Sequence, residues 1–240
     1  MYQPRTYRHW VSSPDLVSFS VAVAETDLRI SASEDLTEEA RRLIIKYRDQ
    51  LEGYIKEQPL FLSSLEPLPG ARGAPSIVKE MVRAARRTGV GPMAAVAGAA
   101  AQYVGVELLK LSPELIVENG GDIFLKSRRE RVVAIYAGGS SLSGKIGIRI
   151  KGAATPLGVC TSSGTVGHSL SFGRADAVVA VAKSAILADA AATAVGNRIK
   201  TVADIAGGLK YAKGIDGLLG AVIILGEKFG AWGDVEICRL

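Results

Sequence analysis

The sequence predicts an α+β fold with a mainly antiparallel sheet packed with helices. Three observations support this class. Strand-like stretches follow one another in runs instead of alternating with helices. The first such run has apolar and polar residues in alternation around a short polar turn. A chain of 240 residues that is 48% hydrophobic can bury a full core. We expect a single domain over residues 1–240, built either as one compact unit or as two lobes that meet at a cleft.

The first elements are a hairpin and a helix. Residues 17–33 (VSFSVAVAETDLRISAS) alternate on both sides of ETD, which predicts two paired strands with one buried face. Thr37, followed by two glutamates, predicts a capped helix start, and apolar residues at helical spacing extend it to about Lys56. Residues 57–75 contain four prolines and are the best linker candidate. Their leucines and phenylalanine indicate a segment that is packed down.

Two helices are predicted next, one beginning at Pro75 and ending near Arg87 and one over residues 93–110. A meander of adjacent strands follows, predicted at 114–118, 122–126, 131–137, 145–151, 156–162 and 175–182. An alanine-rich helix, a shorter helix at 201–213 and two closing strands at 220–226 and 234–240 complete the chain.

Composition excludes several classes of function. The two cysteines form no CxxC pair and only two histidines are present, so neither a disulfide framework nor a zinc site is predicted. The net charge of +5 permits an anionic ligand, but the basic residues are scattered, so we expect no nucleic-acid binding. No apolar run reaches the roughly 20 residues of a membrane span, and the first 15 residues do not read as a secretion signal. We therefore expect a cytoplasmic protein.

Two motif-like stretches are better explained by structure. GSSLSGK at 139–145 is close to a phosphate-binding loop, but Ile146 stands where magnesium coordination needs a hydroxyl. The residues after it alternate like a strand, so a hairpin turn is predicted instead. A serine-hydrolase triad is also excluded, because His168 is only five residues from Ser163 and no GxSxG is present.

The segment VENGGDIFLK at 117–126 has two interpretations. Gly120 and Gly121 separate two apolar strands, which is typical of a tight turn that needs positive φ. The functional alternative is that these glycines expose backbone NH groups to an anion or a flat ring while Asp122 orients a ligand hydroxyl. The spacing alone leaves both open.

The segment CTSSGTVGHS at 160–169 is a second candidate. Thr161, Ser162 and Ser163 precede Gly164 directly after a predicted strand. Hydroxyls and NH groups gathered in one turn suit a phosphate, and they equally suit an ordinary loop.

The alanine-rich segment LADAAATAVGN at 187–197 carries the most informative pattern. Asp189, Thr193 and Asn197 lie at successive i, i+4 positions and form one polar stripe on an otherwise apolar helix. A carboxylate and a hydroxyl from adjacent turns suit a hard cation such as Mg²⁺. The alternative is that Asp189 accepts hydrogen bonds from backbone NH groups of a neighbouring loop, while the alanines allow close packing.

In this order, these segments resemble the signature of the ApbE family, whose best-known members are FAD:protein FMN transferases. The family has a glycine-rich helix start, a GGD or GGN turn, a TSG loop and ADAxAT. The corresponding stretches are MAAVAGAAA at 93–101, GGD at 120–122, TSSG at 161–164 and ADAAAT at 188–193. The resemblance spans roughly 90–200, and the chain resembles a compact branch of the family.

The resemblance implies an ApbE-like, two-lobed single domain that holds FAD as substrate or ligand between its lobes. It implies Asp189 and Thr193 as Mg²⁺ ligands, with a backbone carbonyl near Ala97. The GGD turn and the TSSG loop would bind the flavin nucleotide. The implied reaction transfers FMN to a threonine of an acceptor protein and releases AMP.

The sequence departs from the family in two places. AGAAAQY lacks the lysine and aspartate of the family's AKGxxxD, and the family's HxxDP segment is absent. His168 and Asp176 lie where that segment would follow. We take Asp189 and His168 as the catalytic candidates. Two functions stay open: a magnesium-dependent flavin-nucleotide enzyme, or a non-catalytic module that binds a flavin or another phosphorylated cofactor.

Overall fold

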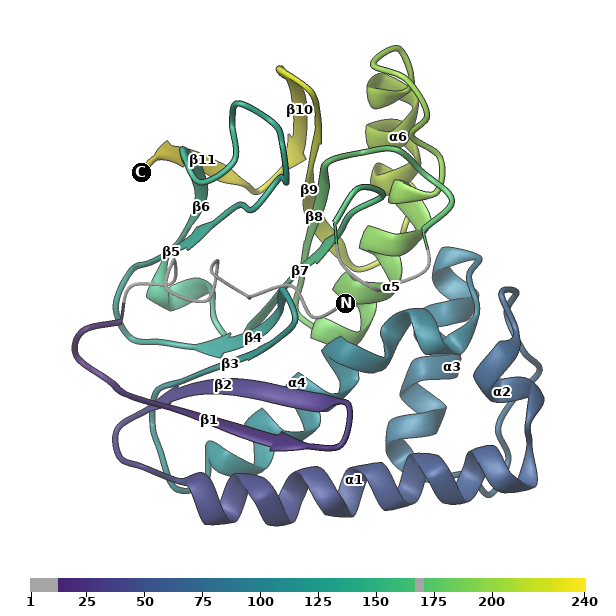
Figure 1. Cartoon of the computed structure of the whole chain (residues 1–240), viewed down its shortest axis with the longest axis vertical. Helices are drawn as coiled ribbons and strands as arrows, with labels where there is room; N and C mark the ends of the chain where they lie inside the picture. The colour runs from purple at the N-terminus through teal and green to yellow at the C-terminus, as the bar shows by residue number, and fades with distance from the viewer. Residues whose placement is uncertain (1–12, 167–170) are drawn as a thin grey trace.

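The computed structural model describes residues 13–166 and 171–240 (Figure 1). These residues form two sheets and six α-helices. Every strand pairing is antiparallel, so the predicted α+β class is confirmed.

The main sheet of the described chain has eight strands in the order β1-β2-β3-β4-β7-β8-β9-β10. Its strands are β1 (Val17–Val23), β2 (Thr26–Ala32), β3 (Leu115–Asn119), β4 (Asp122–Lys126), β7 (Leu157–Ser162), β8 (Ala177–Ala182), β9 (Leu218–Leu225) and β10 (Lys228–Gly233). The smaller sheet has the order β11-β6-β5. Its strands are β5 (Arg131–Ala134), β6 (Ile146–Ile150) and β11 (Glu236–Arg239).

The helices cover one face of the main sheet. They are α1 (Thr37–Glu57), α2 (Leu60–Ser63), α3 (Ser76–Thr88), α4 (Val96–Leu108), α5 (Ala185–Gly196) and α6 (Asp204–Lys213). Helices α4 and α5 pack directly on the strands, and α1 and α3 pack against them from outside (Figure 1). Because side chains alternate along a strand, Phe124 and Cys160 join this helical core.

The smaller sheet covers the opposite face. Ile123, Leu125 and Val159 point that way and form a second core with residues of β5 and β6. Both faces of β4 and β7 are therefore buried, which explains why these strands read as nearly continuous apolar runs.

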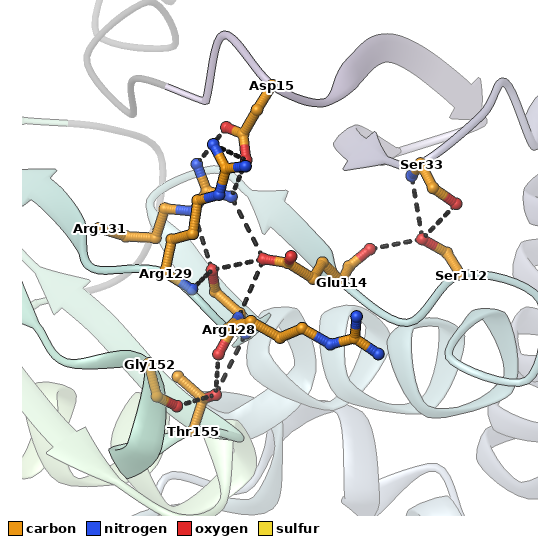
Figure 2. Close-up of polar contacts among 10 residues, drawn as sticks. Asp15, Ser33, Ser112, Glu114, Arg128, Arg129, Arg131, Gly152 and Thr155 are labelled. Carbon is orange, nitrogen blue, oxygen red and sulfur yellow. Dashed lines mark hydrogen bonds and ion pairs between the residues drawn. The ribbon is translucent and has the colours of Figure 1, made fainter.

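A polar network ties the chain together where β3 begins and β4 ends (Figure 2). The Arg131 guanidinium donates to Asp15 Oδ1 at 2.5 Å and to Asp15 Oδ2 at 2.8 Å, and lies 3.4 Å from Glu114 Oε2. Ser127 Oγ donates to the same Glu114 oxygen at 2.8 Å. Arg131 is 5% exposed, so these partners compensate a buried charge. The network fastens the residues before β1 to the start of β5.

Several expected elements differ in detail. Thr37 is the first residue of α1 and not its cap, since Leu36 occupies the N-cap position; Asp35 Oδ1 accepts the Thr37 NH at 2.9 Å. The predicted linker contains the short helix α2, and its Phe61 is fully buried. The meander is interrupted, because β5 and β6 leave the main sheet to form the smaller one. Strand β10 was not predicted, because its glycines and exposed residues lack an apolar alternation.

Candidate functional site

The structure brings the predicted segments to one end of the main sheet. Asn119 ends β3, Asp122 begins β4 and Ser162 ends β7, and the antiparallel pairing places all three at the same edge. The helix start at residues 96–98 and the middle of α5 lie beside this edge, since Asn119 Nδ2 donates to the Ala97 carbonyl at 3.2 Å. His168 lies outside the described residues.

The glycine pair forms the tight turn between β3 and β4. Asn119 and Asp122 are register partners, so the loop has two residues, with φ of 67° at Gly120 and 108° at Gly121. This backbone disfavours any side chain, which confirms the structural alternative. The Gly121 NH donates to Glu118 Oε1 at 2.9 Å. Anion binding by this turn stays a prediction.

Asp122 lies on the helical side of β4 and is 8% exposed. Its register partner on β7 is Cys160. Burial raises the pKa of Asp122 well above its usual range, and the nearby Asp189 charge raises it further. Hydrogen bonds from the Cys160 thiol and the Thr161 NH lower this pKa, but by less. Asp122 Oδ1 is buried and accepts no hydrogen bond from the described residues. A buried carboxylate oxygen without a donor is costly unless a ligand or ion compensates it.

Asp189 joins α5 to the start of α4. Its Oδ2 accepts the Gly98 NH at 2.8 Å. Burial raises the pKa of Asp189 to about 7, and hydrogen bonds from the Gly98 and Ala97 backbone oppose this rise. The helices approach closely here, since a Cβ on Gly98 would lie 2.3 Å from the Ala185 carbonyl oxygen. The structural alternative for Asp189, a bond to a neighbouring backbone NH, is therefore observed for one of its oxygens.

A cleft of about 620 Å³ opens between α1, α4 and the β1–β2 turn. Its apolar walls include Tyr47 and Val104, and it reaches Ala97 and Asn119. Asp189 does not line the cleft; its hydrogen-bond partner Gly98 follows the lining residue Ala97. Thr193, one turn further along α5, is half-buried. The volume is in the range of small-molecule pockets.

The TSSG segment is divided by the pleat of β7. Ser162 faces the helices, where its hydroxyl is 3.6 Å from the Cβ position of Gly196, and Thr161 faces the other way. Ser163 Oγ accepts the NH groups of Thr165 and Val166 at 3.1 and 3.0 Å. The Ser163 hydroxyl therefore stabilises its own loop, as the ordinary-loop alternative predicts. Phosphate binding by the segment stays a prediction.

The segment that precedes β8 adds a further constraint on this loop. Gly164 donates its NH to the Ala175 carbonyl at 2.8 Å, and a Cβ there would lie 2.3 Å from the Gly173 carbonyl oxygen. Glycine is required here by the close approach of two backbones.

Two residues near the site were not singled out by sequence reasoning. Gln102 Oε1 accepts the Ala185 NH at 2.7 Å and the Ser184 hydroxyl at 3.1 Å, and so holds the first turn of α5 against α4. Asn119 fixes the Ala97 carbonyl. Gln102 lies in the stretch AGAAAQY, which departs from the family pattern. This departure is the sequence signal that could have pointed to a role for Gln102.

The carboxylates of Asp122 and Asp189 are hard oxygen ligands, as are the Thr193 hydroxyl one turn along α5 and the Ala97 carbonyl, which accepts from Asn119. Such a set suits Mg²⁺ or Mn²⁺, and the orphaned Asp122 oxygen fits a bound cation. Within the described ranges no cluster of three or more His, Cys, Asp or Glu side chains is present, so a softer multi-histidine or thiolate site is not formed there. Both cysteines are free thiols.

Known structures show the class of this fold. Flavin transferase ApbE from Vibrio cholerae superposes with a TM-score of 0.63 at 14% sequence identity, covering 93% of this chain and 97% of that one. Pseudomonas stutzeri flavinyl transferase ApbE gives a TM-score of 0.60 at 14% identity, with 91% and 94% covered. The chain therefore has the ApbE fold.

Sequence comparison then defines the family. The family model described as AbpE bacteria matches residues 8–221, and the chain belongs to this family. A UPF0280 protein of Methanococcus maripaludis strain C5 is 42% identical over 221 residues, covering 90% of each chain. A UPF0280 protein of Methanocella arvoryzae is 42% identical over 213 residues, covering 88% of this chain and 86% of its own. In the described part of the chain no helix is long and apolar enough to cross a membrane.

Proposed function

We propose that this protein is a magnesium-dependent enzyme acting on flavin nucleotides, by FMN transfer or by cleavage of the FAD pyrophosphate. The observation that carries the proposal is the 2.8 Å hydrogen bond from the Gly98 NH to Asp189. It joins the glycine-rich helix start to the ADAAAT helix, 91 residues away, and so brings two of the family-like segments together. The fold of the ApbE transferases supports the same conclusion.

In this proposal Asp189, Thr193 and the Ala97 carbonyl hold the cation. A bound Mg²⁺ supplies charge neutralisation and polarisation of a pyrophosphate. The Asn119 amide donates to the Ala97 carbonyl at 3.2 Å, and Gln102 holds the first turn of α5 against α4. The cleft beside Ala97 has room for a flat ring against its apolar walls. His168 is the proposed proton-transfer residue.

The test is release of AMP from FAD. Purified protein is incubated with FAD and Mg²⁺, with and without acceptor proteins, and AMP is followed by chromatography against a chelator-treated control. We expect AMP only with metal, loss of release in Asp189→Asn and a reduced rate in His168→Ala. Asp204→Asn, which removes a half-buried carboxylate that accepts the Lys200 and Thr201 NH groups in the turn before α6, is the matched control and should retain wild-type release. Absence of AMP above the chelated control under all conditions would refute the enzymatic proposal.

A non-catalytic binding module is the second candidate. The specific observation in its favour is that the family's lysine and aspartate are missing at 96–103, where Gln102 now makes structural hydrogen bonds to α5. Titration calorimetry separates the two candidates. Tight binding of FAD or FMN without AMP release supports the module, and binding accompanied by turnover rejects it.

A further inference from the structure

Asp122 is the buried carboxylate that the proposed site has not used. From the sequence, Asp122 is predicted to orient a hydroxyl of the ligand, because it follows the glycine turn. Its position argues for a different partner. Asp122 is 92% buried on the helical face of the sheet, and its Oδ1 receives no donor from the described residues. The Cys160 thiol and the Thr161 NH contact this carboxylate, but no donor in the described residues reaches Oδ1.

A chain of contacts places Asp122 beside Asp189. Asp122 is the cross-strand partner of Cys160, whose thiol donates to the Ala185 carbonyl at 3.3 Å. Ala185 and Asp189 are one turn apart on the same face of α5. A Cβ on Gly98 would touch both residues, at 2.3 Å from the Ala185 carbonyl oxygen and 2.9 Å from Asp189 Cβ. Both carboxylates therefore lie in the contact between β4, β7, α4 and α5.

The charges at this contact are unbalanced. Neither carboxylate forms an ion pair with a lysine or arginine of residues 13–166 and 171–240. Two buried carboxyl groups at one place can both be ionised only with a compensating cation, and a divalent ion matches them.

We propose that Asp122 is a second carboxylate ligand of the cation site, so that the metal is held between Asp122 on β4 and Asp189 on α5. This inference rests on the proposed function for the metal and adds a ligand from the sheet. It makes the GGD turn part of the metal centre: the two glycines place the first residue of β4 against α5.

The test is metal binding by the full-length, chelator-stripped protein, measured by Mn²⁺ titration without nucleotide and again with FAD. Wild-type protein should bind one Mn²⁺. Asp122→Asn keeps the size of the side chain and removes its charge, and should weaken Mn²⁺ affinity by about tenfold or more. Asp189→Asn should weaken it at least as much, and Asp204→Asn should match wild type.

Two results overturn the inference in distinguishable ways. Wild-type affinity in Asp122→Asn together with weakened affinity in Asp189→Asn rejects Asp122 and leaves the proposed function standing. Failure of the wild-type protein to bind Mn²⁺ at millimolar concentration, with or without FAD, rejects both.

Thermal unfolding guards against a folding defect. Metal-free Asp122→Asn should be at least as stable as metal-free wild type, because an amide replaces a buried carboxylate. Mn²⁺ should raise the melting temperature of wild type and raise that of Asp122→Asn much less. An equal rise in both proteins contradicts the inference.

Discussion

The crossing of α4 and α5 at Gly98 makes a quantitative prediction for Gly98→Ala. The added Cβ would lie 2.3 Å from the Ala185 carbonyl oxygen and 2.8 Å from its carbonyl carbon, and Cβ atoms are essentially never found under 3.0 Å. The helices must therefore separate by at least about 0.7 Å at this point. Backbone atoms cannot rotate away as a side chain can, so the whole contact has to shift.

The magnitude follows from two opposing effects. Overpacking of this kind costs about 3 kcal/mol, and alanine returns about 1 kcal/mol over glycine inside a helix, for a net loss of about 2 kcal/mol. Gly207→Ala is the matched control, because Gly207 lies in α6 with nothing within 4 Å of its Cβ position. It should gain about 1 kcal/mol.

Urea unfolding followed by circular dichroism measures both variants. We expect a lower midpoint for Gly98→Ala and a higher one for Gly207→Ala, with similar slopes. Gly98→Ala should also weaken metal binding, since the Gly98 NH is displaced from Asp189. If Gly98→Ala unfolds at or above the wild-type midpoint, the helices do not meet as closely as described and the reasoning fails.

Three further predictions concern charge and backbone. Burial raises the pKa of Asp189 from 3.8 to about 7, so the metal-free folded protein keeps a proton that the unfolded chain releases. Up to about 4 kcal/mol of the free energy of unfolding should therefore be lost as pH rises from about 4 to 7. Urea unfolding of Asp189→Asn should show a shallower pH slope; equal slopes would count against burial of the charge. Arg131→Met should cost about 1–3 kcal/mol, because it removes the charge-assisted hydrogen bonds of a buried guanidinium, and Arg149→Met, whose side chain is 36% exposed, should cost much less, as compared by urea midpoints. Similar losses would show that the Arg131 network is not stabilising. Gly121→Ala should cost about 1–2 kcal/mol from φ of 108° alone, since no atom lies within 4 Å, and an unchanged midpoint would mean that the turn relaxes.

Much of the fold could be predicted because the sequence carries local signals. The alternation over residues 17–33 marks the first hairpin, and GG at 120–121 marks a two-residue turn. The sheet to which the strands of residues 131–150 belong could not be predicted, because their apolar pattern is the same whether they join the main sheet or form a second one. Only packing of their apolar side chains against Ile123 and Val159 decides it.

The candidate site was predictable in part for a related reason. The i, i+4 spacing placed Asp189 and Thr193 on one stripe, and the structure shows Asp189 meeting the start of α4 at Gly98. The position of Asp122 beside α5 depends on the pairing of β4 with β7, which joins residues 38 positions apart. Strand pairing over that separation leaves no local mark in the sequence. The roles of Gln102 and Asn119 are hidden similarly, because each partner lies on another element.

The central claim is that a divalent cation occupies the contact between the sheet end and α5. A crystal structure of the protein grown with Mn²⁺ and FAD, with anomalous scattering recorded for manganese, tests it most directly. We expect one anomalous peak at coordination distance from the carboxylates of Asp189 and Asp122 and from the Ala97 carbonyl. A nucleotide bound without such a peak, or a peak remote from Asp189, would contradict it.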